Sequence, residues 1–254
     1  MEPVLRVNHL TKVFTRKGQP DFIAVNHISF DLMPGECLGI IGESGSGKTT
    51  VVNLITRLLD VTEGSILLDG EEITNVRGKA LRKIYAKMQM VFQSPTESFD
   101  PRRRLGDSIG ESLRNSGWSR TDTEAEVGRL LKECGLPAEY ADRYPHQVSG
   151  GECQRAAIAR ALAVRPKLLI CDEVTSALDV TIQKEILELL NGLRWEKGLD
   201  LSILFICHDI ALVQQFCDRV LVMYQGDIVE EGKPDAVIRN PQNEYTKRLI
   251  NSIL

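Results

Sequence analysis

The segment 42–49 combines glycines, a lysine and a threonine at the spacing G-x-x-x-x-G-K-[ST]. Its glycines let backbone N–H groups converge on phosphate oxygens, Lys48 adds a positive charge, and the Thr49 hydroxyl can reach a Mg²⁺ ion. The apolar run Cys37–Ile41 precedes the segment and a helical repeat follows it, so the positive end of a helix also faces this site. The alternative is a flexible turn with this composition by chance. The spacing predicts nucleotide binding and leaves the reaction open.

A second glycine-rich segment, Val148–Arg155, has half of the features of such a loop. Ser149, Gly150 and Gly151 open a predicted helix, but neither a lysine nor a strand accompanies them. A helix start binds anions, although an ordinary serine N-cap has the same composition. Without a lysine this segment cannot catalyse alone. It makes sense if it closes over a nucleotide that another subunit holds.

Polar side chains follow three further apolar runs, which suit buried strands. Asp172 can hold Mg²⁺ through water, and Glu173 can polarise an attacking water, where a general base contributes about 10²–10⁴ in rate. His208 follows the run at 203–207 and can contact a γ-phosphate. Gln93 follows Met90–Phe92 and can sense the metal and the water. The alternatives are a solvated acidic loop, a structural histidine and a surface glutamine.

Strands alternating with helices predict a mostly parallel α/β core. Leu5–Leu10 and Val25–Leu32 alternate as strands before the phosphate loop, and Arg219–Glu231 is predicted to be a hairpin. The stretch from about Ser94 to Arg165 has no convincing strand and predicts a helical insertion. We therefore divide the chain into a nucleotide-binding core with its β region, 1–92 and 166–254, and a helical subdomain, 93–165.

Composition excludes several classes of protein. Charged residues make up 26% of the 254 residues and the net charge is −4, which indicates no strongly basic face for nucleic acid. Runs of about 18 apolar residues, as in membrane spans, are absent, and the N-terminus does not resemble a signal peptide. The six cysteines are scattered, so we expect them to be reduced and buried rather than to form a metal site or disulfides.

These motifs, in this order, resemble the ATPase subunit of ABC transporters over nearly the whole chain, 1–254. The segment 42–49 is similar to Walker A, Gln93 to the Q-loop, and Leu168–Glu173 to Walker B. The resemblance extends to the signature, the D-loop and the switch histidine, which are Ser149–Glu152, Ser176–Asp179 and His208. It implies a P-loop NTPase fold, with a RecA-like sheet core, an N-terminal antiparallel β region and an inserted helical subdomain.

The resemblance also implies a site for ATP and Mg²⁺ shared by two subunits. Phe14 would stack on adenine, and Thr49, Gln93 and Asp172 would hold Mg²⁺. The implied catalytic residues are Glu173, His208 and Gln93. The implied ATP ligands of one chain are Gly42, Glu43, Ser44, Gly45, Ser46, Gly47, Lys48, Thr49 and Thr50, and those supplied by the partner are Ser149, Gly150, Gly151, Glu152 and Asp179.

The implied partners are a second ATPase subunit, two integral-membrane permease subunits and, indirectly, a solute-binding protein outside the cell. This places the chain on the cytoplasmic face of a prokaryotic membrane as a peripheral subunit. Four segments narrow the resemblance to importers of dipeptides, oligopeptides and nickel: Gln93–Arg102, Tyr144–Gln147, Ala177–Gln183 and Asn240–Lys247. The chain stops without the cysteine cluster of many members, as in nickel- or metal-chelate-type subunits. In this group a related partner ATPase is expected more than an identical one.

Three positions depart from the family pattern. Glu152 replaces the common glutamine of the signature, Val174 replaces a proline and Phe14 replaces a tyrosine. Glu152 is expected to bring a carboxylate towards the nucleotide edge. The alternative functions are a soluble ABC ATPase without a permease, disfavoured by the single compact cassette, and a small-molecule kinase, which gives the second glycine segment no role.

Overall fold

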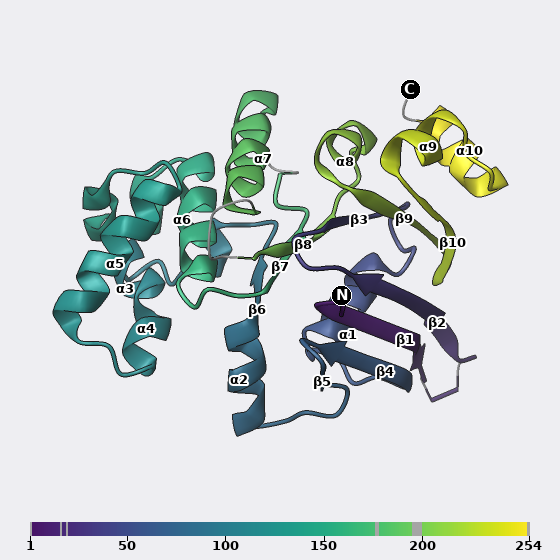
Figure 1. Cartoon of the computed structure of the whole chain (residues 1–254), viewed down its shortest axis with the longest axis horizontal. Helices are drawn as coiled ribbons and strands as arrows, with labels where there is room; N and C mark the ends of the chain where they lie inside the picture. Colours follow the sequence, from purple (N-terminus) through teal and green to yellow (C-terminus); the bar gives the residue numbers. More distant parts are fainter. Residues whose placement is uncertain (1, 16, 19, 176–177, 195–199, 253–254) are drawn as a thin grey trace.

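A central sheet and the elements packed on it account for most of the molecule (Figure 1). The computed structural model describes residues 2–15, 17–18, 20–175, 178–194 and 200–252. Its strands are β1 (Leu5–Phe14), β2 (Phe22–Leu32), β3 (Cys37–Ile41), β4 (Glu63–Leu68), β5 (Glu71–Glu72), β6 (Met88–Val91), β7 (Leu168–Asp172), β8 (Ser202–Ile206), β9 (Arg219–Tyr224) and β10 (Asp227–Gly232). Its α-helices are α1 (Lys48–Ile55), α2 (Lys79–Lys87), α3 (Leu105–Ile109), α4 (Glu111–Asn115), α5 (Arg120–Glu133), α6 (Gly150–Leu162), α7 (Val180–Arg194), α8 (Ile210–Phe216), α9 (Pro234–Arg239) and α10 (Glu244–Asn251). Short 3₁₀ turns are η1 (Thr96–Ser98), η2 (Ala138–Asp142) and η3 (Pro145–Gln147).

The central sheet has the strand order β10-β9-β3-β8-β7-β6. The pairs from β9 to β6 are parallel, and β10 pairs antiparallel with β9. Strands β3 and β8 are buried at every position, as expected for parallel strands covered on both faces. Alternate residues of β7 and β8 belong to two separate cores: Ile170 and Leu204 face one core, and Leu169 and Phe205 face the other. The predicted mostly parallel α/β core is confirmed.

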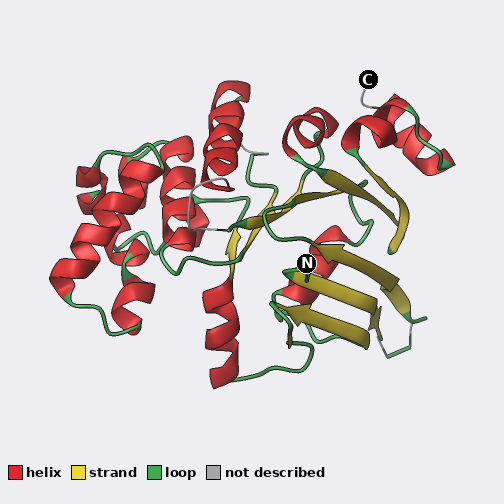
Figure 2. Cartoon of the chain, in the orientation of Figure 1, coloured by secondary structure: helices red, strands yellow, loops and turns green. Residues whose placement is uncertain are grey.

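A second sheet, with the order β2-β1-β4-β5, is antiparallel throughout. Its apolar face shares one core with α1 and one face of the central sheet. Helices α6, α7 and α8 contribute to the other core on the opposite face. Figure 2 shows this separation, with the antiparallel strands on one side and most helices on the other.

Residues 92–167, between β6 and β7, are all described and contain helices and turns without a strand. Helix α5 begins where the Ser119 side chain accepts a hydrogen bond from the Asp122 N–H, and it ends before Gly135, which has a φ of 73°. In Figure 1, α3, α4 and α5 lie at the end of the molecule far from the antiparallel sheet, and α6 joins them to the core. Residues 92–167 therefore form the inserted helical region that the predicted fold class includes.

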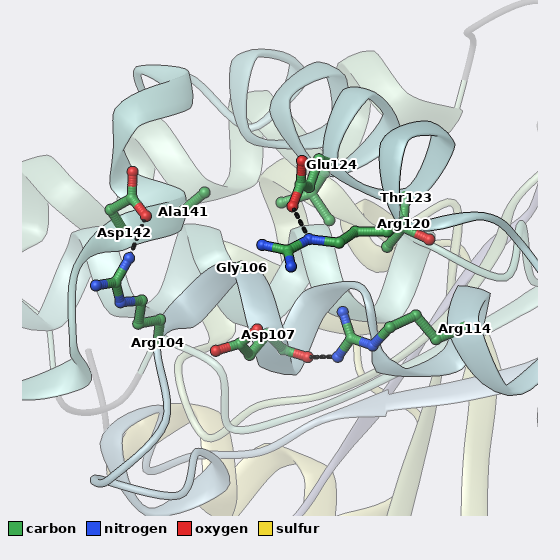
Figure 3. A pocket seen from close by; sticks show the side chains of 10 residues that line it. Arg104, Gly106, Asp107, Arg114, Arg120, Thr123, Glu124, Ala141 and Asp142 are labelled. Atoms are coloured by element: carbon green, nitrogen blue, oxygen red, sulfur yellow. Dashed lines mark hydrogen bonds and ion pairs between the residues drawn. The ribbon is translucent and has the colours of Figure 1, made fainter.

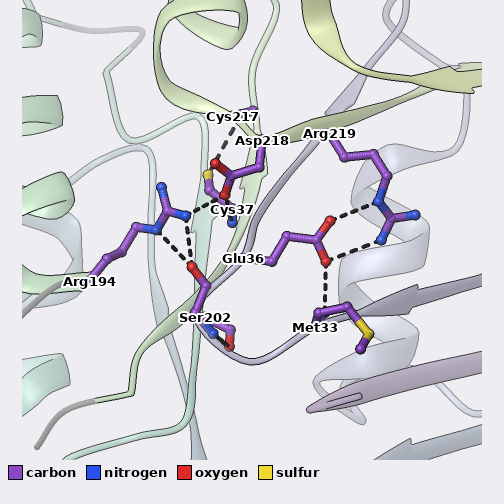
Figure 4. A network of polar contacts seen from close by, with 9 residues as sticks. Met33, Glu36, Cys37, Arg194, Ser202, Cys217, Asp218 and Arg219 are labelled. Atoms are coloured by element: carbon purple, nitrogen blue, oxygen red, sulfur yellow. Dashed lines mark hydrogen bonds and ion pairs between the residues drawn. The ribbon is translucent and has the colours of Figure 1, made fainter. Parts of the chain in front are cut away.

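A polar network fixes the amino end of β3, opposite the end that carries the phosphate loop (Figure 4). The buried Arg194 guanidinium donates to the Gly35 carbonyl at 2.7 Å and pairs with Asp218. Asp218 in turn accepts a hydrogen bond from the Cys37 N–H at 2.8 Å. Close by, Glu36 accepts hydrogen bonds from Arg219 and from a backbone N–H. These bonds satisfy polar groups that would otherwise destabilise a buried strand end.

Some local expectations were wrong or incomplete. A helical repeat was predicted after the phosphate loop, and α1 forms there but ends at Ile55, so that Leu58 is 60% exposed. Arg57 has a φ of 60°, which ends the helix. The sequence also gave no prediction for β4, β5, α2, α9 or α10. All six cysteines lie in described segments, are buried and form no disulfide, as expected.

Candidate functional site

The carboxyl ends of four neighbouring strands bring the predicted residues to one edge of the central sheet. The parallel register aligns Val91 of β6 with Cys171 of β7, and Cys171 with Phe205 of β8. Gln93 and His208 follow β6 and β8, Asp172 ends β7, and Glu173 comes directly after it. Strand β3 lies beside β8 and leads into the phosphate loop. In parallel α/β sheets this edge is where ligands bind.

The phosphate loop, residues 42–47, needs glycine at its two ends. Gly42 has a φ of 151°, and a Cβ there would lie 2.2 Å from the Met223 carbonyl oxygen. Gly47 has a φ of 108°, and a Cβ there would lie 2.5 Å from the Ala24 carbonyl oxygen. The loop is therefore packed against β9 and β2. Gly47 also precedes α1 without a side-chain cap or an acidic residue in the first turn, so the helix start keeps its positive potential for an anion.

Lys48 curls back into this loop. Its Nζ atom donates to the carbonyl oxygens of Gly42 and Glu43, each at 2.8 Å, and lies 3.4 Å from the Ser46 hydroxyl. Burial lowers the pKa of Lys48, and the charges of Glu173 and Asp172 oppose this shift. A cation held at the centre of the loop is suited to phosphate oxygens. Around it, Glu43, Ser44, Gly45 and Thr49 are exposed, and Thr50 is half-buried.

Asp172, Glu173 and His208 form a cluster beside this lysine. Burial raises the pKa of Asp172, as does the neighbouring charge of Glu173, whereas Lys48 and His208 lower it. Glu173 has a φ of 51°, a conformation that glutamate adopts rarely and that is common at functional sites. Its backbone N–H donates to the Ile206 carbonyl at 3.0 Å, and its Oε1 atom contacts His208 Nε2. The structure thus joins the two residues that the sequence predicted as base and γ-phosphate contact.

The residues predicted for Mg²⁺ offer oxygen atoms, which that ion prefers. Asp172 presents a half-buried carboxylate, Thr49 an exposed hydroxyl and Gln93 an exposed side chain. Desolvation of Asp172 makes a cation favourable there. In the described part of the chain, no group of three or more His, Cys, Asp or Glu side chains could hold a metal alone.

The second glycine segment lies apart from the first, at the start of α6 in the helical insertion (Figure 1). Ser149 and Glu152 form a capping box: the Ser149 hydroxyl accepts from the Glu152 N–H at 3.3 Å, and Glu152 Oε2 accepts from the Ser149 N–H at 2.7 Å. Gly151 is packed so closely that a Cβ would lie 2.7 Å from Ile182 Cγ2. Gly150 is exposed, and a Cβ there would meet only ordinary contacts.

Glu152 was expected to bring a carboxylate towards the nucleotide edge, and within the single chain this carboxylate has partners of its own. Its Oε1 atom accepts a hydrogen bond from the Tyr140 hydroxyl. The bond from Tyr140 and then that from the Ser149 N–H lower the pKa of Glu152. The carboxylate is therefore engaged within the helical insertion. The contact between Tyr140 and Glu152 was not predicted. The turn η2 brings the two residues together, and the sequence spacing does not show this.

Phe14 ends β1 half-buried and pairs with Phe22 of β2. The Lys12 ammonium lies 5.2 Å from the centre of the Phe14 ring. Phe22, which the sequence reasoning missed, is 61% exposed. Directly opposed residues of antiparallel strands point to the same face. The two phenylalanines therefore offer an aromatic surface at the hairpin end, near the point where β2 meets the phosphate loop.

Of the predicted D-loop, residues 176 and 177 lie outside the described residues. Asp179 is exposed, and its carboxylate accepts a hydrogen bond from the Ile182 N–H at 3.1 Å at the start of α7. Ser149 and Glu152 bond to one another at the start of α6, in the helical insertion, whereas residues 42–47 precede α1.

A cavity of about 720 Å³ lies elsewhere, between α3, α5 and η2 of the helical insertion (Figure 3). Its arginines are already paired: Arg104 with Asp142, Arg120 with Glu124, and Arg114 with a backbone carbonyl. None of the predicted site residues lines it. We therefore place the candidate site at the sheet edge.

Residues 25–176 match the pattern of the family described as ABC transporter. The chain is 45% identical to the glutathione import ATP-binding protein GsiA of Escherichia coli K12, and 44% identical to that of Salmonella paratyphi A. Both alignments cover 99% of this chain but 41% of the relative, so the chain spans less than half of the length of these proteins.

Solved structures share the whole fold. The TM-score is 0.84 with cbiO1 from Clostridium perfringens, part of the ABC transporter complex cbiONQ, at 29% identity over 100% of this chain and 96% of that one. It is 0.81 with the ATP-binding cassette MJ0796 in a dimeric post-hydrolysis state bound to ADP and Pi, at 29% identity over 91% and 98% of the two chains. The predicted P-loop NTPase fold is confirmed. The family pattern covers more than half of the residues, and the chain belongs to the ABC transporter family as an ATP-binding cassette ATPase.

Proposed function

We propose that this chain is the ATP-hydrolysing subunit of an ABC importer that takes up small peptides. The observation that carries the proposal is the 45% identity to a glutathione import ATP-binding protein along 99% of the chain. Glutathione is a tripeptide, so this relative agrees with the peptide branch of the importer resemblance. Nickel and metal chelates remain the second cargo class of the importer resemblance.

In the proposed mechanism, the phosphate loop binds the triphosphate and Lys48 exchanges its carbonyl partners for phosphate oxygens. Thr49, Gln93 and Asp172 would hold Mg²⁺, which neutralises charge on the phosphates when it is bound. Glu173 accepts the proton of the attacking water, and His208 orients the Glu173 carboxylate beside the γ-phosphate. The aromatic pair Phe14 and Phe22 provides a surface for the adenine.

We propose that a second cassette supplies the residues which this chain cannot bring to its own nucleotide. The Ser149 hydroxyl, the Gly150 and Gly151 amides and Asp179 of each subunit would then face the phosphates bound by the other. Glu152 acts in this scheme as a brace for Ser149 rather than as a nucleotide contact. The partner cassette is proposed to be a related chain, and residues 93–165 form the subdomain that carries this half-site.

A groove of about 380 Å³ supports a membrane partner. It lies between the end of α1, α2, β6 and α6, beside Gln93, and is lined largely by apolar side chains. Two of them, Leu58 and Phe92, are 60% and 44% exposed. No described helix is both long and apolar enough to cross a bilayer. We propose that a cytoplasmic segment of each permease subunit docks in this groove, which makes the chain a peripheral subunit on the cytoplasmic face.

Co-expression with the permease subunits from the same operon tests this function. The natural chain should co-purify with them, and peptides should stimulate ATP hydrolysis of the reconstituted importer together with its solute-binding protein. Leu58→Asp should lose the permeases while retaining ATP binding, whereas the exposed control Val180→Asp should retain them. Full ATPase activity with no permease partner would favour the soluble ABC ATPase instead.

A further inference from the structure

The C-terminal helix α10 touches the phosphate loop, although 202 residues separate the two contacting residues. The hydroxyl of Tyr245, in the first turn of α10, accepts a hydrogen bond from the backbone N–H of Glu43 at 3.0 Å. Tyr245 is only 4% exposed, and burial raises the pKa of its hydroxyl. The hydroxyl therefore stays neutral at physiological pH and keeps its role as an acceptor.

The tail holds this hydroxyl in place through several bonds. The Tyr245 ring stacks on Tyr224 of β9 with 4.1 Å between ring centres and 28° between planes. The Asn243 side chain accepts from the Tyr245 N–H at 2.8 Å and so begins α10. Glu230 of β10 accepts from the N–H groups of Gln242 and Asn243 at 2.8 and 3.0 Å. Strand β10 thus anchors the segment that presents the hydroxyl.

A second bond holds the other side of the loop. The Gly226 N–H, in the β9–β10 turn, donates to the Ser46 carbonyl at 2.9 Å, and the Gly226 carbonyl accepts from the Asn26 N–H at 2.9 Å. The loop is therefore tied at Glu43 and at Ser46 to the C-terminal part of the chain. Neither tie occupies the uncapped start of α1, where an anion would bind.

We propose that Tyr245 is a positioning residue that pre-organises the phosphate loop for nucleotide. A loop that already has its binding conformation loses less entropy on binding, and apparent affinity rises with the fraction of molecules in that conformation. Tyr245 acts through the Glu43 amide and contacts no reacting atom. The inference rests on the proposed role of residues 42–49 and adds a role for Tyr245, whose segment, 240–247, carries the subfamily resemblance but was assigned no function.

Tyr245→Phe tests the proposal, because it removes only the hydroxyl and keeps the buried ring and its stack. The KM for ATP should rise about fivefold, which corresponds to about 1 kcal/mol, the size of one neutral hydrogen bond. The kcat should stay within about twofold, because Lys48, Glu173 and His208 are unchanged. Inhibition by tripolyphosphate, which lacks the base and sugar, should weaken by the same factor as ATP binding.

Tyr224→Phe is the matched control, because it alters the other ring of the same stack and leaves the bond to Glu43. It should match the natural chain in KM and in tripolyphosphate inhibition. Asn243→Ala, which loosens the tail but keeps the hydroxyl, should give a smaller rise in KM. Equal KM in Tyr245→Phe and the natural chain, or equal losses in Tyr245→Phe and Tyr224→Phe, would overturn the inference. A natural chain that hydrolyses no ATP would instead overturn the proposed function.

Discussion

Glu173→Gln separates nucleotide binding from hydrolysis. The substitution keeps the size of the side chain and a hydrogen-bonding atom for His208, and it leaves the backbone bond from residue 173 to Ile206 intact. It removes the only role that requires a carboxylate, which is to accept a proton. A positioned general base contributes about 10²–10⁴ in rate, or about 3–5 kcal/mol at 1.36 kcal/mol per decade. We expect kcat to fall by that factor.

The same substitution should leave ATP affinity unchanged or slightly improved. Burial lowers the pKa of Lys48, and the negative charge of Glu173 opposes that shift. The Glu173 carboxylate therefore acts electrostatically on the site where the phosphates would bind. Neutralising it removes repulsion from the phosphates of ATP. Because bound ATP is no longer consumed, the two-chain complex should accumulate on size exclusion with ATP and Mg²⁺.

Single-turnover hydrolysis and equilibrium binding of labelled ATP measure the two effects separately. Glu188→Gln provides the control, since Glu188 is an exposed acid on α7 that pairs with Lys184 at 3.8 Å. The control should match the natural chain in both assays. Natural turnover in Glu173→Gln, or a loss of ATP binding there with normal folding, would refute the assignment of Glu173 as the base.

Three further changes probe the rest of the site. Lys48→Ala should lower ATP affinity at least tenfold in equilibrium binding, because a buried cation is lost from the loop. If the chain self-associates, mixing the Lys48→Ala and Gly150→Asp variants should restore ATPase activity. One pocket of the mixed pair then has a natural phosphate loop from one chain and a natural second glycine segment from the other. No recovery of activity in mixtures that are shown to pair would argue against a shared site. Hydrogen bonds lower the pKa of Glu152, so its stabilising effect is present at neutral pH and lost as pH falls through that lowered value. Glu152→Gln should therefore unfold at a lower temperature than the natural chain at pH 7, and at the same temperature in acid.

The sequence predicted the strands of the central sheet best where their burial is complete. Leu168–Cys171 and Ile203–Ile206 are continuous apolar runs because both faces of the sheet are covered, and such runs are visible without the fold. The short helices of the tail were not predictable in the same way. Helix α10 has only eight residues and depends on the Asn243 cap and on contacts with β10, which are tertiary.

The spacing of the motifs predicted which reactive residues lie at the edge of the sheet. It did not predict the residues that hold them in position. Gln93, Asp172 and His208 follow strands whose parallel alignment could be anticipated, so their convergence follows from topology. Tyr140 contacts Glu152 because the turn η2 places it there, and Tyr245 contacts the phosphate loop because the C-terminal tail folds back onto that loop. Both contacts depend on the tertiary structure, which the spacing of the motifs does not reveal. Glu152 was expected to bring a carboxylate towards the nucleotide edge, and the sequence did not indicate that a hydroxyl from η2 would bind that carboxylate.

The phosphate loop and the second glycine segment each have their conformation held by bonds within the single chain. The phosphate loop is tied at Glu43 and Ser46, and the start of α6 is braced by Glu152, so neither half must fold when two chains meet. The start of α1 has no acidic residue in its first turn and keeps its positive end, whereas Glu152 lies in the first turn of α6 and offsets the positive end of that helix. In the proposed pair of chains, the phosphates of ATP would lie between the start of α1 in one chain and the start of α6 in the other. We therefore expect nucleotide binding to favour pairing, and loss of the γ-phosphate to weaken it.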